Sequence, residues 1–211
     1  MIDTIIDDND LTEENSEPLL IGITGGIGSG KSSVGTLFAQ SGHIVLNADN
    51  LAKEIMEQPD VMAQIKQIFH QNVMTSEGKL DRKVIGQLVF TSPELLKKLN
   101  AIVHPLVKTH FIEWLQQHKT SSFVLKEVAI LFETNGQDYC DATILVTAPL
   151  ETRIQRVLER DKSTKDIILQ IIQNQLPEEQ KIRLATYVVE NENLEKTYEL
   201  IDILIKKLNN I

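Results

Sequence analysis

Cysteine is nearly absent from this sequence, and so are long uninterrupted apolar runs. The 211 residues include one cysteine, Cys140, which cannot form an internal disulfide and lacks a neighbouring histidine or metal-ligand spacing. No run approaches the roughly 18 apolar residues needed to span a bilayer. The N-terminus also lacks the basic start and apolar stretch of a signal peptide. We therefore expect a cytoplasmic protein with no membrane partner.

Basic residues are too few for a protein that coats nucleic acid. Lys and Arg number 21 against 30 Asp and Glu, a net charge of -9, whereas phosphate backbones are bound by basic side chains. Seven of the acids, and no base, lie within residues 1–17. We therefore expect residues 1–18 to be a flexible acidic tail, either a solvated extension or a functional arm, ahead of a domain at 19–211.

Apolar residues recur with the spacing of alternating strands and helices. Residues 19–24 predict a buried strand, residues 31–40 a helix with one apolar face, and residues 43–46 a second strand. A strand, a helix and a strand within about 30 residues predict a βαβ unit. The expected fold class is therefore α/β, with a parallel sheet flanked by helices.

Residues 51–119 contain almost no strand pattern, which predicts a helical insertion beside the sheet. The expected core is then 19–50 together with 120–211. The insertion pattern predicts helices at 51–57, 61–70, 82–90, 93–103 and 106–117, with Pro59, Gly78, Pro93 and Pro105 between them. Further strands are predicted at 122–132, 142–146 and 187–189, and helices at 149–160, 165–175 and 194–208.

Residues 25–32, Gly-Gly-Ile-Gly-Ser-Gly-Lys-Ser, match the pattern of a nucleotide-phosphate loop. They follow a predicted strand and open a predicted helix, so backbone N–H groups and the helix dipole would face one anion. This predicts a P-loop fold that binds a nucleoside triphosphate, with Lys31 on the phosphates and Ser32 on Mg²⁺. The expected nucleotide-binding residues in this segment are Gly26, Gly28, Ser29, Gly30, Lys31, Ser32 and Ser33.

Asn47 and Asp49 follow the second predicted strand, at the sheet edge where ligands bind in open α/β folds. A carboxylate there could take a proton from an acceptor hydroxyl or coordinate Mg²⁺. Either residue could instead cap the helix that follows. Both readings stay open for Asp49, and they are not exclusive.

Several ordered segments resemble the dephospho-CoA kinase family. The resemblance starts with the phosphate loop and Asn47-Ala48-Asp49 and covers roughly residues 19–208. Further matching segments are Leu80-Asp81-Arg82, Leu99-Asn100-Ala101-Ile102-Val103-His104-Pro105, Leu131-Phe132-Glu133, Gln155-Arg156 with Arg160-Asp161, Gln175 and Asn191. The chain departs from the family pattern at Asn47, where the family has Asp, at residues 129–131, where it has Pro-Leu-Leu, and near Ile171, where it has Arg.

The resemblance implies a nucleotide-binding core, a helical substrate domain at about 51–119 and a lid at about 150–180. It implies transfer of the ATP γ-phosphoryl group to the ribose 3′-hydroxyl of dephospho-CoA, giving CoA and ADP. Asp49 takes the role of catalytic base and substrate contact, and it could also share Mg²⁺. Arg156 would stabilise charge on the transferred group, Arg160 and Asn191 would contact the nucleotide, and Arg82 and His104 the substrate.

Each of these residues also has a structural reading. Arg156 and Arg160 share a helix face and could be solvated partners of nearby acids, Asp81 is most simply a helix N-cap, and His104 could be structural. Glu133 could orient a metal-bound water, although it falls beyond the apolar run of its strand. Phe111, Trp114 and Leu115 have the helical spacing of core residues.

The absence of a guanine-reading Asn-Lys-x-Asp segment argues against a small GTPase. Two alternatives to a dephospho-CoA kinase remain at this point. One is another small-molecule P-loop kinase, acting on a nucleoside monophosphate or on shikimate. The other is a non-catalytic ATP-binding module. The expected assembly is a monomer or a small homo-oligomer.

Overall fold

The computed structural model describes residues 17–161 and 163–210. The predicted acidic tail therefore lies almost wholly outside the described residues. Within these two ranges, every helix is too short or too polar to cross a membrane.

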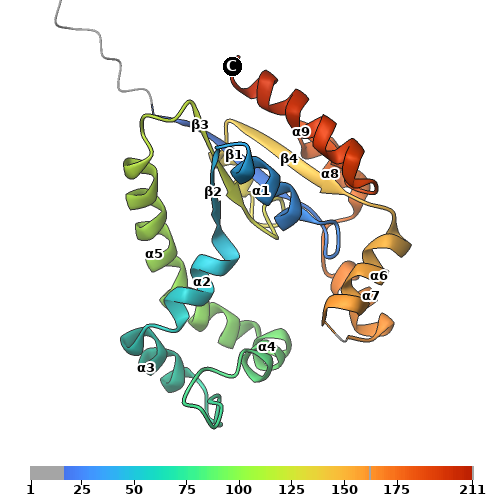
Figure 1. Cartoon of the computed structure of the whole chain (residues 1–211). Helices are drawn as coiled ribbons and strands as arrows, with labels where there is room; N and C mark the ends of the chain where they lie inside the picture. Colours follow the sequence, from blue (N-terminus) through green and yellow to red (C-terminus); the bar gives the residue numbers. More distant parts are fainter. Residues whose placement is uncertain (1–16, 162, 211) are drawn as a thin grey trace, which may run out of the picture.

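Five parallel strands form one sheet at the centre of the molecule (Figure 1). The order is β2-β3-β1-β4-β5, so the strand order reverses beside β1. All carboxyl ends meet at one edge, and ligands bind at such an edge near the reversal. The α/β fold predicted from the apolar pattern is confirmed. The bounds are β1 Leu19–Thr24, β2 Ile44–Asn47, β3 Phe123–Glu127, β4 Ala142–Thr147 and β5 Tyr187–Glu190.

Helices α1 (Lys31–Gln40) and α9 (Leu194–Leu208) lie against one face of the sheet (Figure 1). Their apolar residues close one core with the inward side chains of β1, β3 and β4. On the opposite face of β3, the Lys126 ammonium lies 3.8 Å from the centre of the Phe111 ring. Phe111 belongs to a helix of the insertion, so this contact ties the insertion to the sheet.

The insertion contains four helices: α2 (Ala48–Met56), α3 (Pro59–Ile68), α4 (Arg82–Thr91) and α5 (Pro93–Gln117). They surround an apolar cluster of their own that is separate from the cluster under the sheet. Because α2 starts directly after β2, the insertion begins at the ligand-binding edge of the sheet. The buried members of this cluster are Ile55, Val61, Ile65, Phe69, Val73, Leu80, Ile85, Leu99 and Val103.

Helix α5 runs unbroken through Pro105, so the predicted break between residues 103 and 106 was wrong. Proline removes one N–H from the helix, but Leu99 and Val103 before it are buried in the same cluster that Leu106 and Val107 pack against. Continuous burial of one helix face therefore outweighs the loss of one hydrogen bond.

Two other predictions, one for a strand and one for a helix, differ from the structure in the second half of the chain. The strand predicted at 122–132 ends at Glu127, and the apolar residues Leu131 and Phe132 are buried in a turn instead. Helix α8 (Glu178–Leu184) was not predicted, because its sequence has few apolar residues. It follows α6 (Leu150–Asp161) and α7 (Lys165–Gln173), which were predicted.

Candidate active site

The loop of residues 25–32 joins β1 to α1 and curls at the ligand-binding edge of the sheet. Gly28 and Gly30 have φ values of 78° and 90°, in the left-handed region that favours glycine. A Cβ atom on Gly30 would lie 2.0 Å from the Asn191 amide nitrogen, so this position has no room for a side chain. The loop ends at the N-terminus of α1, where free N–H groups favour a phosphate.

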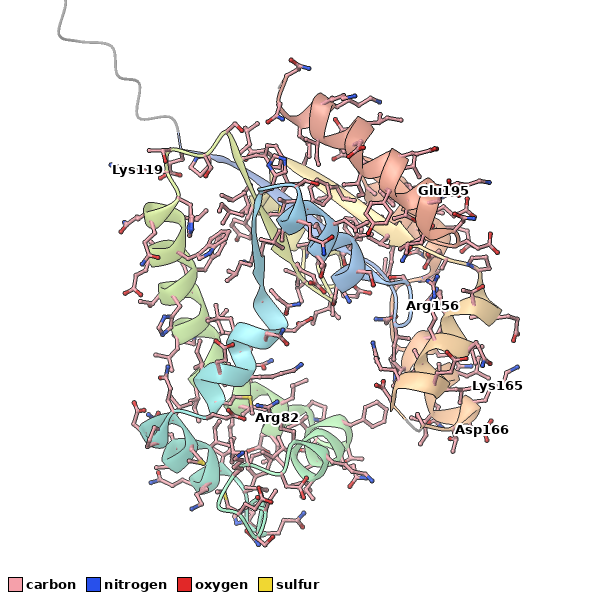
Figure 2. All side chains as sticks on the ribbon, in the orientation of Figure 1. Arg82, Lys119, Arg156, Lys165, Asp166 and Glu195 are labelled. Atoms are coloured by element: carbon pink, nitrogen blue, oxygen red, sulfur yellow. The ribbon has the colours of Figure 1, made fainter. Side chains whose placement is uncertain are left out.

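Two predicted nucleotide residues contact the loop through its main chain. The Asn191 amide donates to the Ser29 carbonyl at 2.9 Å, and its own carbonyl accepts from the Thr197 hydroxyl at 3.1 Å. Asn191 is buried, so it shapes the loop from beneath. The Arg156 guanidinium reaches the same Ser29 carbonyl at 3.5 Å from α6, and Figure 2 shows it beside the loop.

The tip of the loop is held by residues that the sequence did not single out for this role. Arg153 of α6 donates to the Ile27 carbonyl at 3.0 Å, and the Gln175 side-chain carbonyl accepts from the Ile27 N–H at 3.0 Å. Arg153 is buried and pairs with Glu178 of α8 at 3.2 Å. It lies three residues before Arg156, so the helical spacing of basic residues on α6 was the available signal.

Glu127, at the carboxyl end of β3, is the acid at the centre of the site. One carboxylate oxygen accepts from the Ser32 hydroxyl at 2.6 Å, and the other from the Asn47 amide at 2.7 Å. The Lys31 ammonium lies 4.0 Å from the first oxygen, and Glu127 is 3% exposed. Glu127 was not among the predicted site residues, because in the sequence it is a charged residue inside an apolar strand.

The sequence left open whether Asn47 and Asp49 cap a helix or bind a ligand, and the structure gives the two residues different positions. Asn47 is the N-cap of α2, since its side-chain carbonyl accepts from the Asn50 N–H at 2.8 Å. Asp49 lies in the first turn of α2 and is partly buried. The cap reading therefore holds for Asn47 and leaves the Asp49 carboxylate for another role.

Burial raises the pKa of the Asp49 carboxyl group above its usual value, and the nearby charge of Glu127 adds to the rise. Lys31, Lys53 and a hydrogen bond from the Ala129 N–H oppose it. Asp49 lies two residues after Asn47, whose amide bonds Glu127, so its carboxylate is within range of the charges of Glu127 and Lys31. The structure thus brings one carboxylate, one ammonium and a cradle of N–H groups together.

The remaining predicted residues lie away from this group. Arg160 is exposed and bonds the adjacent Asp161 at 2.6 Å, and Ser33 is exposed on α1. His104 is exposed on α5, in a shallow groove with Lys97 and Lys108. Arg82, on α4, pairs with Glu57.

Two acids that had alternative readings have structural partners. Asp81 caps α4 by accepting from the N–H groups of Lys83 and Val84, both at 3.1 Å. Glu133 accepts from the Leu176 N–H at 3.0 Å and lies 3.2 Å from the buried Lys181 ammonium. Glu133 therefore connects the turn after β3 to α8. The acid that contacts the phosphate loop is Glu127, which bonds Ser32.

Comparison with known proteins connects this geometry to one family. A family model described as dephospho-CoA kinase matches residues 19–196. The dephospho-CoA kinase of Fusobacterium nucleatum is 37% identical over 185 residues, which cover 87% of this chain and 95% of the relative. That of Thermus thermophilus is 38% identical over 192 residues, covering 89% and 92%.

Solved structures agree on the fold. The structure of TT1252 from Thermus thermophilus superposes with a TM-score of 0.83 at 36% identity, covering 92% of this chain and 99% of that one. A shikimate kinase from Acinetobacter baumannii, solved in complex with shikimate, gives a TM-score of 0.51 at 15% identity, covering 90% and 93%. At that identity the likeness shows a common fold alone.

Proposed function

The chain belongs to the dephospho-CoA kinase family, and from this membership and the site geometry we propose the reaction. The γ-phosphoryl group of ATP passes to the ribose 3′-hydroxyl of dephospho-CoA, giving CoA and ADP in the last step of coenzyme A biosynthesis. The observation that carries the proposal is the position of Asp49 in the first turn of α2, two residues after Asn47, whose amide bonds the same Glu127 carboxylate that Ser32 of the phosphate loop bonds.

The loop and Lys31 hold the triphosphate. N–H groups along residues 28–33 face the β-phosphate, and the Lys31 ammonium neutralises charge on the β- and γ-phosphates. Arg153 and Asn191 keep the loop curled through Ile27 and Ser29. Phosphoryl transfer depends mainly on positioning and electrostatics, so a loop held in its binding shape contributes directly to the rate.

Asp49 orients the acceptor hydroxyl and removes its proton. Its carboxylate is partly buried in the first turn of α2, next to the carboxyl end of β2. A raised pKa makes the carboxylate a stronger base than an exposed aspartate. As the hydroxyl oxygen attacks phosphorus, the proton passes to Asp49 and ADP leaves from the opposite side.

Helices α6 and α7 act as the lid in this proposal, and helices α2–α5 as the acceptor-binding part. Arg156 lies on α6 and touches the loop through a 3.5 Å hydrogen bond to Ser29. Its guanidinium can turn from that carbonyl to the transferred phosphoryl group, where arginine stabilises developing charge.

The residues around the loop fit Mg²⁺ held jointly with the phosphates. Ser32 supplies a hydroxyl oxygen, and Glu127 and Asp49 supply carboxylates. Among the described residues no three His, Cys, Asp or Glu side chains form a metal cage, and Mg²⁺ in kinases uses one or two carboxylates with phosphate and water oxygens. When bound, the ion neutralises charge on the phosphates.

Activity should decline at acidic pH at a higher value than an ordinary aspartate would give. Protonated Asp49 cannot accept the hydroxyl proton, and because its pKa is raised it takes up a proton before an exposed aspartate does as pH falls. The check is a profile of kcat/KM against pH. Lys53→Gln removes a positive charge that lowers this pKa, so it should move the acid limb to higher pH. A limb that stays in place would contradict the assignment of Asp49.

The direct test of function is an assay of ADP release with Mg²⁺-ATP and a panel of acceptors. We expect turnover with dephospho-CoA, a product phosphorylated at the ribose 3′-hydroxyl, and turnover at least about 10²-fold lower with shikimate and AMP. Comparable turnover with shikimate or AMP would point to another small-molecule kinase. ATP binding with no transfer to any acceptor would point to a binding module.

A further inference from the structure

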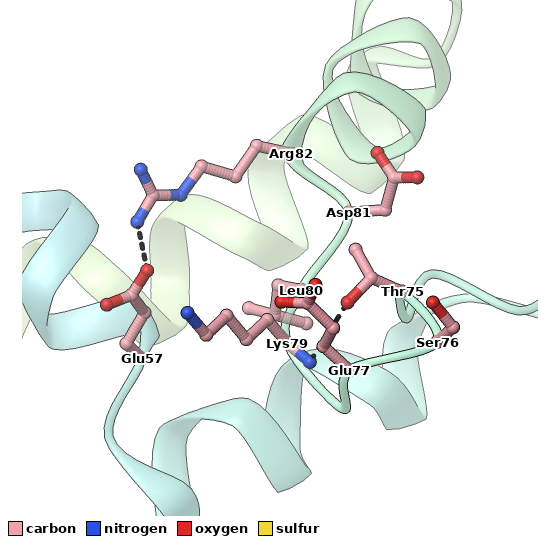
Figure 3. Close-up of a pocket in the computed structure, with 8 residues that line it drawn as sticks. All are labelled: Glu57, Thr75, Ser76, Glu77, Lys79, Leu80, Asp81 and Arg82. Carbon is pink, nitrogen blue, oxygen red and sulfur yellow. Dashed lines mark hydrogen bonds and ion pairs between the residues drawn. The ribbon is translucent and has the colours of Figure 1, made fainter.

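A pocket of about 400 Å³ lies at the far end of α2 from Asp49. It is formed by the residue after α2, the turn at 75–80 and the start of α4 (Figure 3). The loop at its wall is held by a bond from the Lys79 N–H to the Thr75 hydroxyl at 3.3 Å. The pocket is therefore a formed part of the insertion.

One cation pairs with a carboxylate in this pocket, and a second cation points toward it. The Arg82 guanidinium pairs with Glu57 at 2.5 Å, and Figure 3 shows the Lys79 ammonium also pointing toward the Glu57 carboxylate. Asp81 points away from it because it caps α4. Arginine and lysine converging on one point form the arrangement that binds phosphate, and here a side chain of the protein occupies that point.

Helix α2 connects this pocket to the catalytic carboxylate. Asp49, Lys53 and Glu57 are spaced four residues apart, so they share one helix face, and the ends of this row are about 12 Å apart along the axis. Arg82 also donates to the Lys53 carbonyl, at 3.5 Å. The Arg82 side chain thus reaches back along α2 toward Asp49.

We propose that the pocket binds the 5′-diphosphate of the acceptor and that Glu57 competes with it for Arg82 and Lys79. The inference rests on the proposed function: dephospho-CoA carries its 3′-hydroxyl and its 5′-diphosphate on one ribose. With the hydroxyl at Asp49, the diphosphate extends along α2 to the two cations and displaces Glu57.

The exposure of the pair makes this exchange favourable. The side chains of Arg82 and Glu57 are 44% and 53% exposed, and exposed ion pairs contribute little to stability. A diphosphate carries more charge than one carboxylate and can bind both cations at once. Glu57 then weakens the binding of the diphosphate and leaves the binding of acceptors without a diphosphate unchanged, because these do not contact the two cations.

The test is binding of dephospho-CoA to Glu57→Gln in the absence of ATP, measured by calorimetry. Removing the competing charge should lower Kd about two- to fivefold, and KM for dephospho-CoA should fall similarly while KM for ATP stays constant. The gain should shrink at high salt, and adenosine, which has no diphosphate, should bind both proteins equally. Glu94→Gln is the matched control, because Glu94 forms an exposed pair with Lys98 far from α2.

Unchanged or weaker binding by Glu57→Gln would overturn the proposal, since Glu57 would then hold Arg82 in place. Glu57→Ala repeats the test with a smaller side chain, and thermal unfolding verifies that both variants fold. In Glu57→Gln/Arg82→Gln the gain should disappear. If wild-type protein binds dephospho-CoA but does not phosphorylate it, the proposed function fails, whereas the effect of Glu57 on binding is still measured.

Discussion

Replacing Asp49 with asparagine should lower kcat by about 10³-fold, within the range of about 10²–10⁴ for loss of a general base. Asparagine has the same shape and can still accept a hydrogen bond, but it cannot take the acceptor proton. The Kd for ATP should stay within about twofold, because the loop and Lys31 hold the phosphates. Single-turnover phosphorylation and ATP titration measure the two quantities separately.

Asp60→Asn is the matched control for this variant. This control variant makes the same chemical change in the first turn of the neighbouring helix α3, where the side chain is exposed. It should leave turnover unchanged. If Asp49→Asn keeps turnover within a few-fold of wild type, another group removes the proton and the assignment of the base is wrong.

Replacing Glu127 with alanine should lower kcat/KM for ATP by about 10²–10³-fold. Its carboxylate fixes the Ser32 hydroxyl, the Asn47 amide and the Lys31 ammonium at the same time. Without it, the Ser32 hydroxyl and the Asn47 amide lose their acceptor and Lys31 loses its nearest acid, so the phosphate and metal contacts are no longer aligned. Steady-state kinetics at several Mg²⁺ concentrations measure the loss.

Glu133→Gln separates this effect from a general loss of stability. Both acids lie on the segment that begins with β3, but Glu133 pairs with Lys181 of α8. Its replacement should reduce the free energy of unfolding and leave kcat at saturating ATP close to wild type. Normal kinetics in Glu127→Ala together with inactive, folded Glu133→Gln would reverse the roles given to the two acids.

The phosphate loop was the part of the site that the sequence could identify. Glycine spacing, a preceding strand and a following helix are local features, and the structure confirms β1, the loop and α1 within the predicted bounds. Asp49 was singled out because the residues after a β-strand in a βαβ unit face the ligand edge, and its catalytic role stays a prediction. These inferences need only short-range patterns.

Glu127 and Arg153 could not be assigned in the same way. An apolar run does not show where a strand ends and a buried turn begins, so Glu133 was placed nearer the strand end than Glu127. The register of β2 against β3 decides the matter, since it sets Asn47 beside Glu127. Arg153 contacts a residue 126 positions away, and its spacing from Arg156 shows a shared helix face but not which residue it contacts.

Both polar groups of the Ile27 main chain are bound by residues of the C-terminal helical region, Arg153 on one side and Gln175 on the other. When α6 and α7 move away from the nucleotide, they must therefore either pull the tip of the phosphate loop with them or break these two hydrogen bonds. Release of ADP and rearrangement of the phosphate loop are then coupled, and we expect the rate of this coupled step to limit turnover.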